Sequence, residues 1–120
     1  MKKVSRIDAV FVPVTNLKKS EEWYLNVFPF EVIYRSSDGK YVGFRFQEKG
    51  DEKTALTLYQ VDKVPKQEHI AFNFYTEDVD GMHHFLKSNG YKVDDIHGGD
   101  GMRFFKVFDP DGNVFELVTF

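Results

Sequence analysis

Histidine is the side chain in this sequence best suited to metal binding or proton transfer, because cysteine is absent. Without cysteine the chain has no disulfide, no thiolate metal site and no cysteine nucleophile. The four histidines are His69, His83, His84 and His97. His83 and His84 are adjacent in a stretch with helical spacing, where neighbouring side chains point about 100° apart. We therefore expect both to be solvent-exposed rather than to share a metal.

A glycine-rich stretch at residues 98–101 follows His97. Glycines at such a place can cradle a phosphate. This stretch, however, lacks the Lys-Ser/Thr of a phosphate-binding loop and does not open a helix. We predict a mobile loop that gates a binding cleft.

The charge balance excludes several classes of partner. Sixteen basic and nineteen acidic residues give a formal net charge of −3. No basic stripe with interleaved aromatics is present, so nucleic-acid binding is disfavoured. The apolar stretch after Lys2-Lys3 is interrupted by Arg6 and Asp8 and is too short for a signal peptide. No run approaches the ~20 apolar residues of a membrane helix, and we expect a cytoplasmic protein with no membrane partner.

Aromatic residues make up 17% of the chain, thirteen of them phenylalanine. Two interpretations stay open. A small β-rich domain can fill its core with rings, or the rings can line a pocket for a flat ligand.

The first half of the chain predicts one helix among four strands. Residues 6–14 are rich in valine and isoleucine and are predicted to form a strand. Asn16 can cap a helix over residues 17–27, which Pro29 ends. Further strands are predicted over residues 31–36, 41–47 and 54–59, with a turn at 37–39 and a charged loop at 48–53.

The order restarts after a polar linker at residues 60–68. Residues 69–74 are predicted to form a strand, and Thr76 or Asp78 can cap the helix that follows. Asn89-Gly90 is a helix stop, and strands are predicted over 91–96, 102–108 and 114–120. The predicted apolar face of this helix consists of Val79, Met82, Phe85 and Leu86.

This recurrence indicates an internal repeat of strand, capped helix and three strands. Each unit is too small to bury its own sheet face. We therefore predict an α+β fold, a single domain over residues 1–120 built from two tandem βαβββ modules at about 4–60 and 67–120. Their curved mixed sheets are expected to form a cleft, with the helices outside, and binding or chemistry is expected in that cleft.

Two segments carry a resemblance to a known family. One is the turn Asp109-Pro110-Asp111-Gly112-Asn113, between Phe105/Phe108 and Phe115-Glu116-Leu117. The other is the pattern Ile7, Val14, Asn16-Leu17, Ser20, Trp23-Tyr24 and Phe30. Together they resemble the vicinal oxygen chelate superfamily, which includes glyoxalase I, bleomycin-resistance proteins and extradiol dioxygenases. The resemblance spans the whole chain and implies the fold predicted above.

The resemblance also implies where a metal would bind. Catalytic members typically hold a divalent metal with four ligands, one from the first and one from the last strand of each module. In this sequence those positions fall on Ala9, Thr57, His69 and Glu116. His69 and Glu116 suit Zn, Ni, Fe or Mn, whereas Ala9 cannot bind metal and Thr57 is a poor ligand. The resemblance thus implies an incomplete metal site, with no resident cofactor or a weakly bound divalent metal.

His69 and Glu116 can also have roles that do not involve a metal. His69 can be satisfied by a backbone partner, and Glu116 can pair with a neighbour such as Arg103. In a metal-free pocket, Glu116 could act as a base and His69 as an acid or hydrogen-bond donor.

Strand alternation extends the candidate cleft lining. Side chains two or four residues from the four metal-ligand positions point the same way, and Arg103 is a candidate anion anchor. The candidate ligand-binding residues are Phe11, Thr57, Tyr59, Asn73 and Arg103. This mixed lining suits a partly flat organic ligand.

Three functions follow from these observations. The leading hypothesis is a small-molecule-binding protein of the glyoxalase/bleomycin-resistance type, with an incomplete metal site and an aromatic or antibiotic ligand. The second is a divalent-metal-dependent lyase, isomerase or thiol transferase that uses His69 and Glu116. The third is a non-catalytic regulatory module. The resemblance also implies a homodimer.

Overall fold

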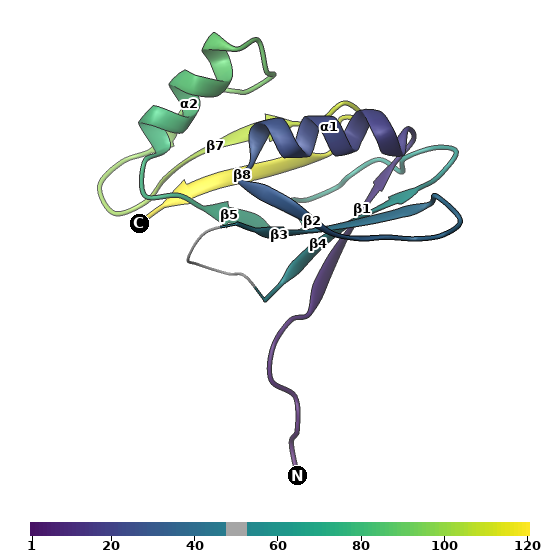
Figure 1. The fold of residues 1–120 in the computed structure, drawn as a ribbon. Helices are drawn as coiled ribbons and strands as arrows, with labels where there is room; N and C mark the ends of the chain where they lie inside the picture. The colour runs from purple at the N-terminus through teal and green to yellow at the C-terminus, as the bar shows by residue number, and fades with distance from the viewer. Residues whose placement is uncertain (48–52) are drawn as a thin grey trace. The chain divides into compact units, whose positions relative to one another are not determined.

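The computed structural model describes residues 1–47 and 53–120, so the predicted charged loop lies almost wholly outside the described residues. The chain divides into two compact units, Met1–Val64 and Pro65–Phe120, called module one and module two below and described separately. Within the described residues, two helices and two four-stranded mixed sheets confirm the predicted tandem βαβββ fold (Figure 1). No described helix combines the length and apolarity needed to cross a membrane.

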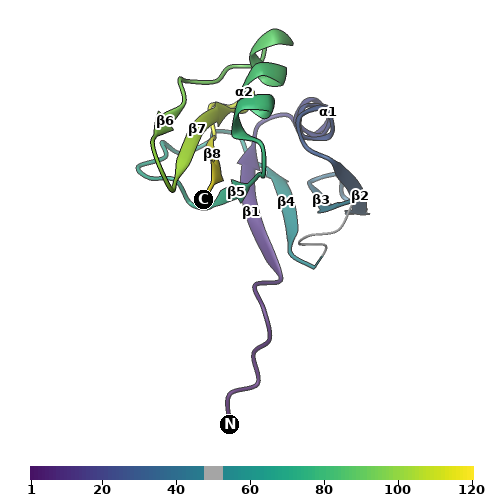
Figure 2. The same cartoon turned by 90° about the vertical axis from the view of Figure 1, so that its left-hand side faces the viewer.

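Module one follows the predicted order. Its elements are β1 (Ala9–Val14), α1 (Leu17–Val27), β2 (Phe30–Arg35), β3 (Tyr41–Phe46) and β4 (Ala55–Gln60). They form sheet A in the order β1-β4-β3-β2, with β1 parallel to β4 and the other neighbours antiparallel. Helix α1 lies against one face of this sheet (Figure 2).

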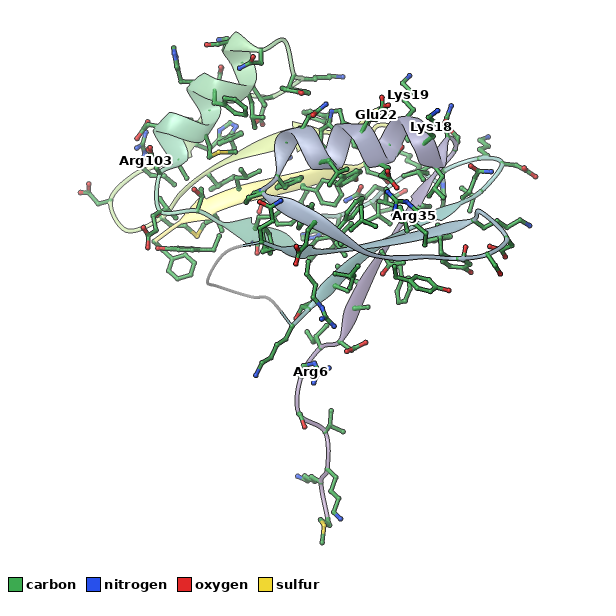
Figure 3. All side chains as sticks on the ribbon, in the orientation of Figure 1. Arg6, Lys18, Lys19, Glu22, Arg35 and Arg103 are labelled. Carbon is green, nitrogen blue, oxygen red and sulfur yellow. The ribbon has the colours of Figure 1, made fainter. Side chains whose placement is uncertain are left out.

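Helix α1 begins and ends where the sequence predicts. The Asn16 side chain accepts a hydrogen bond from the Lys19 amide at 3.1 Å, which caps the first turn. The Phe28 amide donates to the Tyr24 carbonyl at 3.0 Å, and Pro29 follows. The helix buries Ser20, Tyr24 and Val27. On its other side Lys18, Lys19 and Glu22 point away from the sheet into solvent (Figure 3).

The core of module one lies between α1 and one face of sheet A. The Tyr24 ring stacks on Phe44 at a centroid distance of 6.1 Å. Burying side chains of this size contributes about 1.5–3 kcal/mol each. The other buried strand residues alternate along β1, β3 and β4: Val12, Val14, Val42, Leu56 and Leu58. The opposite face, which we call the helix-free face, carries the intervening residues.

Module two repeats this plan with shorter edge strands. Its elements are β5 (Asn73–Tyr75), α2 (Val79–Ser88), β6 (His97–Gly98), β7 (Arg103–Phe108) and β8 (Val114–Thr119). They form sheet B in the order β5-β8-β7-β6 (Figure 2). Helix α2 contacts β7 and β8. The core contains Val79, Leu86, Phe105, Val107, Phe115 and Leu117.

The predicted ends of α2 are confirmed, but its predicted apolar face needs a correction. Asp78 is the N-cap and accepts from the Gly81 amide at 2.8 Å. Phe85 is 44% exposed, not buried. His83 is half-buried instead, with its ring edge-on to Phe105 and its Nε2 donating to the Asp94 carbonyl at 2.9 Å. The expectation that both adjacent histidines are exposed therefore holds only for His84.

The predicted strand at residues 69–74 is wrong over residues 69–72, because β5 spans only Asn73–Tyr75. The cause is a side chain that takes the place of backbone pairing. The Gln67 amide accepts from the Val114 N–H and donates to the Val114 carbonyl, both at 3.0 Å. These bonds occupy the edge of β8 that a longer β5 would use. His69 consequently lies before the strand, not in it.

The predicted strand at residues 91–96 is also wrong. Only an isolated bridge from Val93 to Val107 forms there, and the short β6 comes later. The Asp94 carboxylate accepts the Lys106 amide at 2.6 Å. A side-chain acceptor thus replaces a backbone carbonyl at this point, and the regular ladder is interrupted.

Candidate functional site

Two of the predicted ligand-binding residues are neighbours on the helix-free face of sheet A. Phe11 on β1 lies opposite Thr57 on β4, and Thr57 lies opposite Gly43 on β3. Phe11 is 60% exposed and Thr57 is half-buried. A side chain at Gly43 would be in contact with the Thr57 hydroxyl, since an added Cβ would lie 3.4 Å from its Oγ1. Because residue 43 is glycine, no side chain covers the sheet surface beside Thr57.

A second row of side chains on the same face contains the predicted residue Tyr59. It lies opposite Pro13 on β1 and Tyr41 on β3. The Tyr41 and Tyr59 rings are stacked with centroids 6.5 Å apart. Tyr41 is 41% exposed, and Tyr34, opposite Gly43, is 56% exposed. The helix-free face of sheet A is therefore an aromatic surface, and the sequence reasoning missed Tyr34 and Tyr41 as members of it.

The same face offers no strong metal ligand at the positions that the resemblance singles out. Ala9 lies opposite Ala55 in the parallel ladder, two residues from Thr57. An alanine methyl has no donor, and a neutral threonine hydroxyl binds divalent metals poorly.

Module two brings His69 and Glu116 together. Both line a cavity of about 260 Å³, whose lining consists of Gln67, Glu68, His69, Ile70, Lys106, Val114 and Glu116. Asn73 lies opposite Glu116 in the β5–β8 ladder, which puts both on the helix-free face of sheet B. Lys106 on β7 is the neighbour of Glu116 on its other side. Lys106 is a pocket residue that the sequence reasoning missed.

Gln67 and its neighbours position His69. Besides its two bonds to Val114, the Gln67 amide donates to the His69 carbonyl at 3.1 Å. The His69 ring then places Nδ1 2.8 Å from the Ile70 carbonyl. Because a carbonyl only accepts, Nδ1 carries the proton, and in neutral His69 the lone pair resides on Nε2. A metal or a substrate proton would bind at Nε2.

The turn before β8 positions Glu116 and Lys106. Asp109 is buried, and its Oδ1 accepts from the amides of Asp111 at 2.9 Å and Asn113 at 2.8 Å. Gly112 has φ of 83°, the left-handed conformation that glycine adopts without cost. This turn confirms the hairpin predicted from its residues. It sets Phe108 opposite Val114, and two residues further along each strand it pairs Lys106 with Glu116.

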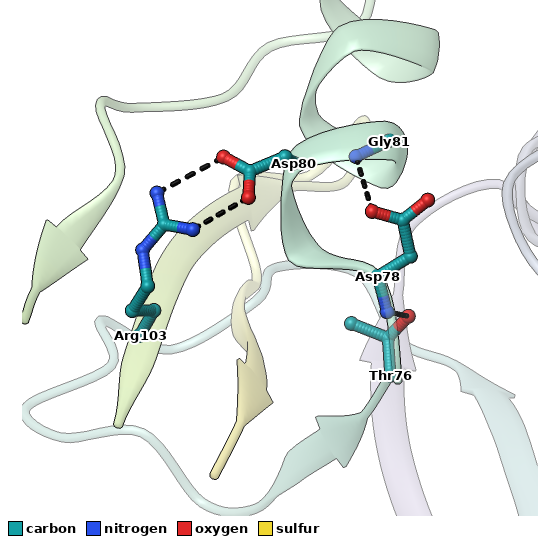
Figure 4. Close-up of polar contacts among 5 residues, drawn as sticks. All are labelled: Thr76, Asp78, Asp80, Gly81 and Arg103. Atoms are coloured by element: carbon teal, nitrogen blue, oxygen red, sulfur yellow. Dashed lines mark hydrogen bonds and ion pairs between the residues drawn. The ribbon is translucent and has the colours of Figure 1, made fainter. Parts of the chain in front are cut away.

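Arg103, the predicted anion anchor, lies on the other side of the sheet. It lies two and four residues before Phe105 and Val107, the buried residues that face α2, and therefore shares their face. Its guanidinium makes a bidentate ion pair with Asp80 on α2 (Figure 4). This hydrogen-bonded pair lowers the pKa of Asp80 and raises that of Arg103. Arg103 thus clamps the helix to the sheet and contributes no charge beside Glu116.

His97 belongs to a separate cluster around Asp94. Its Nε2 lies 3.2 Å from Asp94 Oδ2, and its ring is 5.5 Å from Phe104. Asp94 also accepts from the Lys106 amide and from His83. One aspartate therefore links α2, β6 and β7, which explains why two histidines without an evident role occur here.

The donor set does not fit a complete divalent metal centre. Over residues 1–47 and 53–120 no group of three or more histidine, cysteine or acidic side chains could hold a metal. His69 and Glu116 supply two donors in the module-two cavity, and structural and catalytic sites ordinarily use three or four. Lys106 adds a positive charge to the same cavity.

Comparison with known proteins identifies the family. Residues 6–117 match the profile described as Glyoxalase/Bleomycin resistance protein/Dioxygenase superfamily. The chain belongs to this superfamily. The resemblance stated from the turn at residues 109–113 and from the N-terminal pattern is thereby confirmed.

Solved structures of other proteins share the fold. TnmS3, an antibiotic-binding protein from Streptomyces sp. CB03234, is 23% identical with a TM-score of 0.81, over 98% of this chain and 97% of that one. A mutant of the fosfomycin resistance protein FosX from Listeria monocytogenes, in complex with Mn(II) and 1S,2S-dihydroxypropylphosphonic acid, is 21% identical. Its TM-score is 0.78, over 95% and 91% of the two chains. Lactoylglutathione lyase from Agrobacterium tumefaciens is 21% identical with a TM-score of 0.72, over 96% and 93%.

These likenesses establish a shared fold. The three structures are of an antibiotic-binding protein, a resistance protein in complex with manganese, and a lyase. One fold therefore serves both binding and catalysis, so the function of this chain must be argued from its own side chains.

Proposed function

We propose that this protein binds a partly flat organic ligand, aromatic or antibiotic in type, and does so without a complete metal centre. The observation that carries the proposal is the aromatic helix-free face of sheet A, where Phe11 is 60% exposed beside Thr57. Exposed rings on a rigid sheet suit a ligand with a π-system, because stacked or edge-on ring pairs contribute about 0.5–1.5 kcal/mol beyond their buried area. The similarity to an antibiotic-binding protein supports the same class of ligand.

Each candidate residue has a distinct part in this proposal. Phe11 and Tyr59 provide apolar ring surface, and the Thr57 hydroxyl beside Gly43 can give or accept one hydrogen bond. In module two, Asn73 and Glu116 are opposite one another and offer polar contacts. A few polar groups on an otherwise apolar surface orient a ligand.

Ligand titration tests the proposal. Isothermal calorimetry is carried out with bleomycin and fosfomycin, after which the family and one similar protein are named, and with a planar anthraquinone as the flat aromatic ligand. We expect the planar aromatic to bind, and the double variant Phe11→Ala/Tyr59→Ala to bind it about tenfold or more weakly, since two ring contacts are lost. Phe85→Ala on α2 removes an exposed ring from another surface and serves as the control. Undiminished binding by the double variant would refute the proposal.

A second candidate function is a metal-dependent lyase, isomerase or thiol transferase. It is favoured by the shared cavity of His69 and Glu116 and by the His69 tautomer, which presents Nε2. A bound metal would supply Lewis-acid activation, with His69 and Glu116 as its ligands. Without metal, Glu116 can accept a proton as a base, and protonated His69 can donate one.

Metal stoichiometry separates the two candidates. Untagged protein is incubated with Mn, Fe, Co, Ni or Zn, desalted, and measured by plasma mass spectrometry. The leading proposal predicts no ion retained at a stoichiometric level. About one ion per chain that is lost in His69→Ala/Glu116→Ala would favour the enzyme. If neither a ligand nor a metal binds, the third hypothesis, a regulatory module, becomes the working interpretation.

The proposal also includes a homodimer, as the family resemblance implies, and a cytoplasmic location. Light scattering after size-exclusion chromatography measures the mass, and the monomer mass is 14.0 kDa. A mass of one chain at micromolar concentration would contradict the dimer.

A further inference from the structure

The cavity of module two contains charges of both signs. Lys106 supplies one ammonium, Glu116 one carboxylate, and His69 an imidazole whose Nε2 accepts. Glu68 also lines the cavity but is solvent-exposed, so water screens its charge. The half-buried pair of Lys106 and Glu116 therefore dominates the electrostatics of the pocket.

Lys106 and Glu116 lie side by side on sheet B but do not form an ion pair with each other. They are direct neighbours in the β7–β8 ladder, where side chains on one face start about 5 Å apart. Among the ion pairs of the described residues, none joins Lys106 to Glu116. Both residues line the cavity, so a group bound there lies beside both of them.

A ligand of a single charge would meet one favourable and one unfavourable partner. An anion attracted by Lys106 is repelled by Glu116, and a cation attracted by Glu116 is repelled by Lys106. A zwitterion pairs both charges at once, and an ammonium has further protons for His69 Nε2. The ammonium and the carboxylate of an α-amino acid are attached to the same carbon. Their close spacing suits two charged side chains at adjacent positions on neighbouring strands.

The size and remaining lining of the cavity suit a compact headgroup with an apolar stem. A volume of about 260 Å³ lies below the roughly 300–1,000 Å³ of pockets for drug-sized ligands. Ile70 and Val114 provide apolar contacts. Arg103 cannot substitute for Lys106, because it lies on the helix side and pairs with Asp80.

We infer that the module-two cavity recognises a zwitterionic α-amino carboxylate group, with Lys106 pairing the carboxylate and Glu116 and His69 accepting from the ammonium. The inference rests on the proposed function insofar as His69 and Glu116 bind ligand rather than metal. The inference specifies the charged group that the module-two cavity binds, whereas the proposed function specifies a flat ring system that binds to the aromatic face of sheet A.

Three probes with one ring test this inference: L-phenylalanine, 3-phenylpropionate and phenethylamine. They share a phenyl group and differ in carrying both charges, the negative charge alone or the positive charge alone. Binding is followed by ¹H–¹⁵N NMR at the amides of Ile70, Lys106 and Val114. We expect saturable shifts with L-phenylalanine and about tenfold or weaker binding of the other two, because each lacks one charge-assisted hydrogen bond. Equal binding of either single-charge probe, or no binding of any probe, would overturn the inference.

Two variants assign the charges. Lys106→Met should weaken L-phenylalanine binding about tenfold and make phenethylamine the better ligand, whereas Glu116→Gln should make 3-phenylpropionate the better ligand. The matched controls are Lys92→Met, whose ammonium lies 4.8 Å from the centre of the Phe108 ring, and Glu31→Gln in module one. Both controls should keep the preference of the unaltered protein. An unchanged preference in both pocket variants would show that these charges do not select the ligand.

The probe series remains decisive if a pocket variant fails to fold, since it uses the unaltered protein. The two proposals also fail separately. Selective binding of L-phenylalanine with no anthraquinone binding would sustain the cavity and refute the aromatic surface. The reverse result would sustain the aromatic surface and refute the zwitterion pocket. One stoichiometric metal ion held by His69 and Glu116 would refute both.

Discussion

Modules one and two share a sheet order but build the edges of their sheets differently. In module one both edge strands, β1 and β2, are six residues long. In module two the corresponding strands β5 and β6 are three and two residues long. The central strands are six residues long in both. The repeat thus preserves the centre of the sheet, where the core lies, and varies the edges.

Side chains take the place of backbone pairing at the edges of sheet B. Gln67 pairs with the backbone of Val114, and Asp94 accepts the Lys106 amide. A buried or half-buried backbone group needs a partner, but a side-chain amide or carboxylate satisfies it as well as another strand does. The helix-free faces differ as well: that of sheet B also carries the rings Phe104 and Phe108, but it places the charged pair Lys106 and Glu116 between them.

The largest expected effect comes from truncating matched core rings. Phe44 on β3 and Phe105 on β7 are both fully buried, and they lie on corresponding central strands of the two sheets. Phe44→Ala and Phe105→Ala should each lower the free energy of unfolding by about 3–5 kcal/mol. Chemical denaturation measures the loss, and amide exchange locates it. We expect faster exchange in the altered module than in the other, and equal acceleration in both modules would show that they unfold only together.

The hairpin turn of module two gives the next largest effect. Gly112 has φ of 83° and open space around it, so Gly112→Val acts through backbone strain alone. The expected loss is about 1–3 kcal/mol, seen as a lower melting temperature. Gly99→Val is the matched control, because Gly99 also has open space but not a left-handed φ. A melting temperature equal to that of the control would contradict the argument.

Removing the hydrogen bonds between the Gln67 side chain and the Val114 backbone tests whether this side chain takes the place of a paired strand. Gln67→Met keeps the size of the side chain and leaves the half-buried Val114 N–H unpaired, at a cost of about 1–3 kcal/mol. Hydrogen exchange at Val114 should accelerate, and the His69 resonances should broaden. Gln47→Met in module one removes a single bond to the Phe30 carbonyl and should have a smaller effect. Unchanged exchange at Val114 would argue against this role of Gln67.

The smallest expected effect concerns the Arg103–Asp80 pair. The pair lowers the pKa of Asp80, so its stabilising contribution is present above the ordinary aspartate pKa and is lost as pH falls through the lowered pKa. Arg103→Met should therefore lower the melting temperature slightly at neutral pH, and the difference should shrink as the pH falls below the ordinary aspartate pKa. Arg6→Met, which loses an exposed pair with Asp8, is the control. A difference that persists in acid would assign the effect to packing.

The sequence predicted the central elements better than the edges. Alternation marked β3, β4, β7 and β8, because a strand with one buried face has a period of two. The edge strands of module two were predicted too long, because no sequence pattern indicates that the Gln67 and Asp94 side chains bind backbone groups. For the candidate site, the resemblance brought His69 and Glu116 to attention. Lys106 could have been found by counting back from the turn at residues 109–113, which pairs it with Glu116.

The sequence by itself determined the family, the repeated order of elements, the helix caps and the Gly112 turn. These depend on local spacing and on backbone preferences that few residues impose. Only the tertiary structure decided that Arg103 faces α2 while Lys106 lies opposite Glu116 on the other face of sheet B. It also decided that His83 is half-buried while Phe85 is exposed. Strand register and the choice of packed face depend on contacts between residues distant in sequence, and one residue of register moves a side chain to the opposite face.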